Sequence, residues 1–328
     1  MAHYCLKATC ETVHYGGFSA SIPPAIAIDS GDTLDVETFT GFGIYKQAPE
    51  EFLPPELLDI CLGLPQERQV GDGPHLMTGP IYVNNARPGD VLEVQLMDIQ
   101  PRVPMGFNAI RPGWGALTER FGEGHLRFIP LDLKQGVAEF PEDSGIAIPI
   151  KPIFGIMGVA TSDERSSVPP GFYGGNIDNP ELVAGTTLFL PVSLPGALFS
   201  IGDGHAAQGD GEVCGTAIET SMNGTIRLTV RQDLQINFPI AETATDIITT
   251  GYAPTLDEAL QIALHSMVDL MVATTQLSEK EAYCLCSMAA NFRITQVVNS
   301  PQKGIHGLLP KSLFQQKLSL LQATPALV

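Results

Sequence analysis

Short apolar runs, separated by turn residues, recur along most of the chain. Between residues 91 and 99, Leu92, Val94 and Leu96 alternate with Glu93 and Gln95, which is typical of a strand buried on one side. Turn sequences rich in Gly, Pro, Ser and Asp bound most of these runs. The pattern predicts strands over residues 25–29, 32–39, 81–84, 91–99, 146–150, 187–192, 212–219 and 224–234.

Helical periodicity is clear only near the C-terminus. From Thr255 to Gln276, apolar residues recur every three or four positions, and Thr255 with Glu258 forms a capping-box sequence. A second helix is expected over 278–288, where Ser278 and Glu281 repeat that spacing. Many strands with few helices between them predict a mainly β fold, a sandwich or barrel-like β-rich body. A smaller α+β section at about 240–315 would carry the two helices.

The chain is expected to form one unit over residues 1–328. Residues 102–125 are rich in Gly and Arg and poor in pattern, which leaves a subdivision near 100–150 open. Six cysteines without a CxxC pair indicate reduced thiols, as expected of an intracellular protein.

Charge and hydropathy exclude several classes of partner. The 36 Asp and Glu residues outnumber the 18 Lys and Arg residues, and the net charge is −18. No basic cluster is available to displace counterions from nucleic acid or to bind anionic lipid, so neither partner is expected. The N-terminus has no secretory signal pattern, and no run of about 18 apolar residues occurs. We therefore expect a soluble, cytoplasmic protein.

The densest group of chemically active residues lies between Ile201 and Glu219. This stretch reads IGDGHAAQGDGEVCGTAIE, so acidic residues, an imidazole and five glycines share 19 positions. Imidazole nitrogen and carboxylate oxygen are ligands of zinc and other borderline divalent cations, and glycine lets the backbone approach a ligand closely. The alternative interpretation is a glycine-rich hairpin with a solvated acidic rim.

The register of that hairpin decides whether its polar groups can meet. Asp203 and His205 share one face of a strand. A three-residue turn at 209–211 pairs Ile201 with Glu219 and places Glu219 on this same face. A two-residue turn shifts the register by one and sends Glu219 to the opposite face. We favour the three-residue turn because it gathers three potential ligands.

Six motifs, in order along the chain, resemble the acetamidase/formamidase family over about residues 10–315. They are residues 13–16 (VHYG), 30–38 (SGDTLDVET), 75–83 (HLMTGPIYV), 88–94 (PGDVLEV), 174–178 (GGNID) and 202–212 (GDGHAAQGDGE). The resemblance implies a mostly β fold, a homo-oligomer, bound zinc or calcium, and hydrolysis of short amides; some related proteins hydrolyse γ-lactams. Two departures, Tyr15 in place of Trp and Phe172-Tyr173 where His is common, bear on substrate choice.

The residues suggest how amide hydrolysis would be carried out. We expect His205, Asp203 and Asp178 to hold the metal, with Zn²⁺ favoured and Ca²⁺ as the alternative. Glu219 is the candidate for proton transfer, and two further catalytic candidates are Glu37 and His75. Backbone N–H groups of the glycine-rich turn could bind an oxyanion; its residues are Gly174, Gly175 and Asn176. Each carboxylate could instead cap a turn or lie on an exposed face, and each histidine could be structural.

These observations predict metal-dependent hydrolysis of a short linear amide, formamide or acetamide, to carboxylate and ammonia. No long apolar groove is evident from the sequence, so small amides are the expected substrates. One alternative is a γ-lactamase on the same scaffold, and another is a non-catalytic β-rich binding protein with a structural metal. A serine amidase is disfavoured because no GxSxG nucleophile-elbow sequence occurs.

Overall fold

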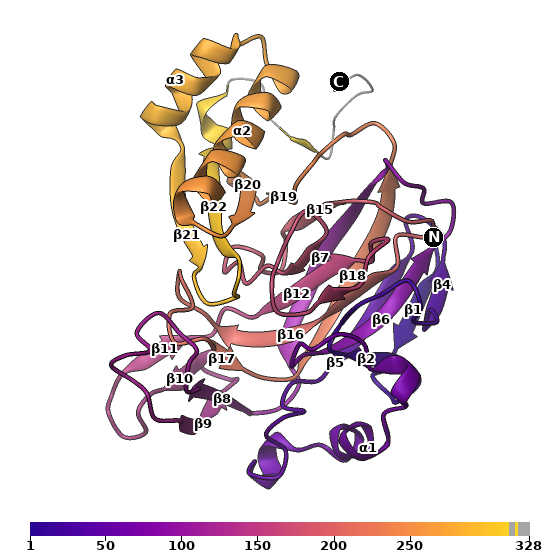
Figure 1. Cartoon of the computed structure of the whole chain (residues 1–328), viewed down its shortest axis with the longest axis vertical. Helices are drawn as coiled ribbons and strands as arrows, with labels where there is room; N and C mark the ends of the chain where they lie inside the picture. Colours follow the sequence, from indigo (N-terminus) through magenta and orange to yellow (C-terminus); the bar gives the residue numbers. More distant parts are fainter. Residues whose placement is uncertain (315–318, 321–328) are drawn as a thin grey trace.

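The computed structural model describes residues 1–314 and 319–320, and most of its regular structure is strand. Figure 1 shows two helices packed at one end of the molecule and a third at the opposite end. The α-helices of the described residues are α1 (Pro55–Gly63), α2 (Leu256–Thr274) and α3 (Glu279–Ala289), with short 3-10 turns at Glu50–Phe52, Gln66–Arg68 and Lys311–Leu313.

A nine-stranded sheet runs through the body and continues into the C-terminal section. All neighbours pair antiparallel except the first two, which are parallel. In spatial order its strands are β1 (His3–Leu6), β5 (Thr33–Thr38), β18 (Met222–Arg231), β7 (Val91–Pro101), β15 (Thr187–Pro191), β19 (Ile240–Glu242), β20 (Asp246–Ala253), β22 (Lys303–Pro310) and β21 (Asn291–Gln296).

A second sheet of eleven strands lies against the first. Its main path is β11 (Ala147–Pro149), β10 (Val137–Glu139), β9 (His125–Asp132), β8 (Met105–Ile110), β17 (Ile218–Glu219), β16 (Phe199–Ala207), β12 (Ile153–Val159) and β14 (Gly174–Asn176). β6 (Leu76–Val83) also pairs with β16, and it carries β2 (Val13–Tyr15) and β4 (Ile26–Ile28). A small separate pair joins β3 (Gly17–Phe18) and β13 (Arg165–Ser166).

The two sheets pack face to face around a shared hydrophobic core. Val94 and Leu228 from the first sheet belong to the same buried cluster as Phe154 and Ile201 from the second. Every residue of β16 is buried, so polar side chains on this strand are shielded from bulk water. The predicted mainly β fold is confirmed, and the described strands form packed open sheets and no closed barrel.

The two predicted C-terminal helices are confirmed together with their caps. Thr255 accepts a hydrogen bond from the backbone N–H of Glu258, and Ser278 with Glu281 forms a complete capping box. α2 packs closely on β20, where a side chain at Gly251 would come within 2.0 Å of the Ala259 carbonyl oxygen. No helix in the described part of the chain is long and apolar enough to cross a membrane.

The strand predicted over 212–219 was wrong for most of its length. Only Ile218–Glu219 is strand, and residues 208–217 form a long connection from β16. His205 pairs with Glu219 and Ala207 with Ile218 across a bulge, so both predicted registers were wrong. Glu219 nevertheless reaches the expected face, because residues paired directly across two strands project to the same side.

Candidate functional site

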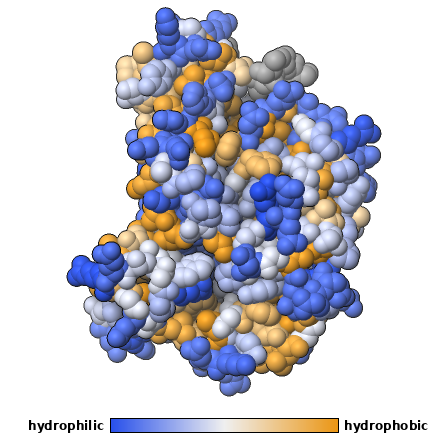
Figure 2. All heavy atoms as spheres, viewed as in Figure 1, coloured by the Kyte–Doolittle hydropathy of each residue, from blue (hydrophilic) through white to orange (hydrophobic). Residues whose placement is uncertain are grey.

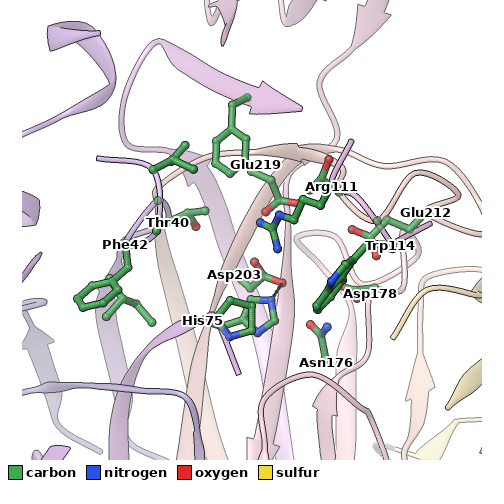
Figure 3. Close-up of a pocket in the computed structure, with 18 of the residues that line it drawn as sticks. Thr40, Phe42, His75, Arg111, Trp114, Asn176, Asp178, Asp203, Glu212 and Glu219 are labelled. Carbon is green, nitrogen blue, oxygen red and sulfur yellow. Dashed lines mark ion pairs between the residues drawn. The ribbon is translucent and has the colours of Figure 1, made fainter. Parts of the chain in front are cut away.

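A pocket of about 260 Å³ opens where the end of β16 meets loops from distant parts of the sequence. Figure 3 shows charged side chains converging on its centre. Residues lining it include Phe39, Thr40, Phe42, Ile44, His75, Leu76, Phe107, Arg111, Trp114, Asn176, Asp178, Asp203, Glu212, Thr216, Glu219 and Asn299.

Five sequence-predicted residues, three of them carboxylates around one imidazole nitrogen, meet in a single cluster. The Nε2 atom of His205 lies 3.3 Å from Oε2 of Glu219, 3.4 Å from Oδ2 of Asp203 and 3.9 Å from Oδ1 of Asp178. His75, immediately before β6, places its own Nε2 3.9 Å from Oδ2 of Asp203. The structure thus brings together the three predicted metal ligands and two of the predicted catalytic residues.

Three acidic residues of the site have a left-handed backbone conformation, which residues other than glycine rarely adopt. The φ angles are 47° at Asp178, 55° at Asp203 and 45° at Glu212. This left-handed conformation costs a residue with a Cβ on the order of 1–2 kcal/mol. Such residues cluster at functional sites, where the surrounding fold holds a side chain in a direction that regular backbone cannot give it.

A glycine of β12 makes room for this cluster. A Cβ at Gly155 would lie 2.5 Å from Oδ1 of Asp178, 2.8 Å from Cε1 of His205 and 2.9 Å from Oδ2 of Asp203. Each distance is below ordinary van der Waals contact. The three side chains can therefore converge only because residue 155 has no side chain.

The hydrogen bonds of Gln208 determine which nitrogen of His205 faces the cluster. The Nε2 amide of Gln208 donates to the backbone carbonyl of Asp178 at 2.6 Å, so its Oε1 is directed to Nδ1 of His205, at 2.9 Å. Because an amide oxygen only accepts, Nδ1 of His205 carries the proton in this bond. In the neutral imidazole, Nε2 then presents its lone pair to the carboxylates.

Asp178 is held in a similar way from the C-terminal section. Asn299 donates its side-chain N–H to Oδ2 of Asp178 at 2.5 Å, and Oε1 of Gln296 accepts the backbone N–H of Asn299. The other carboxylate oxygen of Asp178, Oδ1, is buried without a hydrogen-bond partner, as is Nε2 of His205. Buried polar atoms rarely lack a hydrogen-bond partner, so these two atoms are candidate ligand-binding atoms.

The donor set fits a divalent cation. Two groups of ligand atoms, each within 4.8 Å of one another, share His205: Asp178 with Asp203, and Glu212 with Glu219. All five residues are buried. One imidazole nitrogen with several carboxylate oxygens suits zinc or a similar borderline cation.

Burial and crowding shift the acid–base properties of these groups in opposite directions. Burial raises the pKa of Asp178 to about 7, with the Asp203 carboxylate adding to the shift, and burial also raises the pKa of Glu212. The pKa of His205 is raised because the Glu219 and Asp203 carboxylates outweigh burial. Burial lowers the pKa of His75. The cluster therefore retains protons that a cation would displace.

The remaining sequence-predicted site residues lie elsewhere, with one exception. The Glu37 carboxylate forms an ion pair with Arg102 at 2.9 Å and is not among the lining residues of the pocket. Gly174 and Gly175 also lie outside the lining, and the N–H of Gly174 donates to the carbonyl of Gly171. Asn176 does line the pocket, and its buried Oδ1 has no hydrogen-bond partner.

Several lining residues were not selected from the sequence. Glu212 lies in the glycine-rich motif, and its nearness in the sequence to His205 and Glu219 could have identified it as a site residue. Arg111 and Trp114 belong to the segment that showed little pattern. The Arg111 guanidinium lies 5.7 Å from the centre of the Trp114 ring, and none of the described residues accepts a hydrogen bond from its side chain or pairs with it. Asn299 carried no local signal.

Proteins of related sequence are known. The chain is 29% identical over 265 residues to a candidate formamidase of Schizosaccharomyces pombe, covering 63% of this chain and 61% of that protein. It is 29% identical over 218 residues to an acetamidase of Mycolicibacterium smegmatis, covering 48% and 53% respectively. The alignments thus span about half to three-fifths of these relatives' length.

Solved structures match over nearly the whole chain. A predicted acetamidase/formamidase of the thermophile Thermoanaerobacter tengcongensis superposes with a TM-score of 0.82 and 31% identity, covering 97% of this chain and 99% of that one. A γ-lactamase from Delftia acidovorans, with a TM-score of 0.62 and 21% identity over 96% of this chain and 94% of that one, shares the fold. The acetamidase/formamidase family model matches residues 11–167 and 163–316. The chain belongs to the acetamidase/formamidase family.

Proposed function

We propose that this protein hydrolyses a linear amide to a carboxylate and ammonia with the help of a bound divalent cation. The single observation that carries the proposal is the meeting of Nε2 of His205 and Oδ1 of Asp178 beside an open pocket, both buried and without a hydrogen-bond partner. The names of the relatives, formamidase and acetamidase, support formamide and acetamide as members of the substrate class.

The cation would be held by Asp178, Asp203 and His205. A zinc ion in such a site lowers the pKa of bound water and polarises a carbonyl. The imidazole nitrogen favours zinc, because calcium prefers a shell of oxygen ligands; calcium is the alternative. Gln208 would orient His205 and Asn299 would orient Asp178, each through a hydrogen bond. Residues that hydrogen-bond to metal ligands commonly fix the ligands' orientation in this way.

Other residues of the pocket would handle protons and charge. The Oε2 atom of Glu219 is directed at the cluster while its Oε1 accepts the backbone N–H of Ala217 at 2.9 Å, so the carboxylate has a fixed orientation. We assign to it the proton taken from water and returned to the departing nitrogen. Figure 3 shows Arg111 extending toward the centre of the pocket, where its charge can stabilise the carbonyl oxygen as negative charge develops.

The open pocket favours catalysis over a purely structural metal. A structural zinc site is closed by protein ligands, whereas a catalytic one keeps a position for water or substrate. Here Asp178, Asp203 and Glu219 belong to the candidate ligand cluster and also line the 260 Å³ pocket. A γ-lactam remains an alternative substrate, supported only by the shared fold of the Delftia protein.

A homo-oligomer is part of the proposal. Figure 2 shows hydrophobic residues gathered at the end of the molecule that carries α1, where Leu62 is 75% exposed. Exposed apolar areas of this kind are where protein partners pack. Neither nucleic acid nor a membrane is expected as a partner, given the net charge of −18.

The proposal is tested by metal content and ammonia release measured together. Chelation should abolish amide hydrolysis and Zn²⁺ should restore it. His205→Ala should lose metal and activity together, because the ligand nitrogen is gone. Glu219→Gln keeps the shape of the side chain but cannot accept a proton, so metal should remain while kcat falls roughly 10²–10⁴-fold. Full activity in protein shown by elemental analysis to be free of metal would refute the mechanism.

A further inference from the structure

We propose that the pocket contains a separate apolar compartment for the acyl chain of the substrate, so that amides of about four to six carbons are preferred to formamide and acetamide. This inference rests on the proposed amide hydrolysis and specifies its substrate class. The compartment is formed by five residues: Phe39, Phe42, Ile44, Leu76 and Phe107.

The size of the pocket supports this assignment. A water molecule occupies about 30 Å³ in the liquid, so 260 Å³ corresponds to roughly eight or nine water-sized volumes. Acetamide has only four non-hydrogen atoms and would leave more than half of the space to water. A substrate that displaced this water from apolar walls would bind more tightly.

The pocket is divided chemically from one side to the other. Figure 3 shows Phe42 on one side and Trp114 and Asp178 on the opposite side, with His75 and Asp203 between them. An amide whose carbonyl carbon lies at the cluster can therefore direct its carbon chain toward Phe42. The acidic side would exclude that chain, because burying apolar carbon against carboxylates displaces their water without replacing its hydrogen bonds.

The apolar walls are supported from behind, which gives the compartment a defined shape. The Phe42 ring packs against Tyr15, with ring centres 4.4 Å apart. Phe107 packs edge-on against Phe52 at 5.7 Å and also contacts Phe128. Phe39, Leu76 and Phe107 are almost fully buried, so they support the wall from behind. Phe42 and Ile44 are only partly buried and present most of its open surface to a ligand. Packed aromatic walls of this kind present a fixed surface to a ligand.

The reaction itself is ordinary hydrolysis. In hexanamide the C–N bond breaks, a C–O bond forms with oxygen from water, and the protons of water pass to nitrogen, giving hexanoate and ammonium. Each methylene buried in the compartment is worth about 0.8 kcal/mol, which corresponds to roughly fourfold in kcat/KM. From acetamide to butyramide, with two added methylenes, an increase of about fifteenfold is expected.

The test compares kcat/KM for formamide, acetamide, butyramide and hexanamide with the metal-loaded protein. Values should rise with chain length at least as far as butyramide. Phe42→Trp and, separately, Ile44→Phe should lower the ratio of hexanamide to acetamide turnover at least tenfold, because each reduces the compartment. Phe121→Trp, at a partly exposed aromatic outside the pocket lining, is the matched control and should leave the ratio unchanged.

Calorimetric binding to metal-free protein separates this inference from the proposed function. Hexanamide should bind at least tenfold more tightly than acetamide even where nothing is turned over. Turnover that is highest for formamide or acetamide and falls with chain length would overturn the compartment and leave amide hydrolysis standing. Faster cleavage of N-butylacetamide than of hexanamide would also overturn it, since the chain would then lie on nitrogen. Absence of turnover for every amide would refute the proposed function, and the binding order would still decide the inference.

Discussion

The side-chain oxygen of Gln208 lies 2.9 Å from Nδ1 of His205, and the amide nitrogen of the same glutamine donates to the backbone of Asp178. One side chain thus orients two candidate metal ligands that lie 27 residues apart in the sequence (178 to 205). This relationship gives the most direct mutational test of the site.

Gln208→Leu should weaken Zn²⁺ affinity by roughly 10–100-fold, the usual effect of removing a partner that orients a metal ligand. The imidazole of His205 would then lose the acceptor that fixes its tautomer. Titration with a competing chelator measures the affinity. Gln47→Leu, at an exposed glutamine, is the control and should bind as the unaltered protein does. Equal affinities for both variants would show that Gln208 has no part in the site.

Gly155→Ala should abolish metal binding while the protein still folds. The added methyl would lie 2.5 Å from Oδ1 of Asp178 and would push the ligands apart. Gly122→Ala is the matched control, since the nearest atom there is 3.9 Å away. Elemental analysis and circular dichroism are the measurements, and a metal-loaded Gly155→Ala protein would contradict the geometry we describe.

Arg111→Met should lower kcat roughly 10²–10³-fold, the range found when one group that stabilises a developing oxyanion is removed. Metal content should not change, because Arg111 is not among the candidate ligands. Arg120→Met removes an arginine of the same loop region that stacks on Phe121, and it should have little effect. Steady-state kinetics decide the matter: a loss confined to KM would assign Arg111 to substrate binding alone.

Acid should destabilise the protein through two buried histidines outside the pocket lining. Burial, with nearby Arg68, lowers the pKa of His14 to about 3, and burial, with Arg293, lowers that of His306 to about 3. Below pH 6.5 the unfolded chain binds protons at both positions while the folded chain does not. Stability is therefore complete above about pH 6.5 and falls as the pH drops toward 3, by up to about 1.4 kcal/mol per pH unit for each histidine.

Urea denaturation at pH 7, 6, 5 and 4 measures this slope. His306→Gln should make the decline shallower, because one of the two proton sites is removed from the unfolded chain. His265→Gln, at an exposed histidine of α2, is the control. An unchanged slope in His306→Gln would assign the acid sensitivity to other groups.

Local signals predicted two of the three described α-helices and fewer than half of the 22 described strands. The caps at Thr255 and Ser278 involve residues three positions apart, so sequence spacing alone identifies them. α1 was missed because its nine residues begin at Pro55 and bury few apolar side chains, Leu57 and Ile60 among them. Short helices of this kind depend on tertiary packing more than on their own periodicity.

The hairpin shows where sequence reasoning failed and why. Its register depends on a bulge after His205 and on a ten-residue connection, 208–217, whose path is set from outside. The N–H of Gly211 donates to the carbonyl of Thr295, and the N–H of Val297 donates back to Gly211. No pattern within 201–219 encodes a contact with residues more than 80 positions away. Asn299 escaped selection for the same reason.

The candidate ligands, from Asp178 to Glu219, are completed by Asn299 from the far end of the chain and by Gly155, which gives them space. No short fragment contains this arrangement, so a cation meeting the unfolded chain would find only scattered weak ligands. If a cation binds as proposed, high-affinity binding therefore requires that both sheets and the C-terminal section have come together. The rate at which a metal-sensitive dye reports cation uptake during refolding would therefore measure the rate of this final assembly.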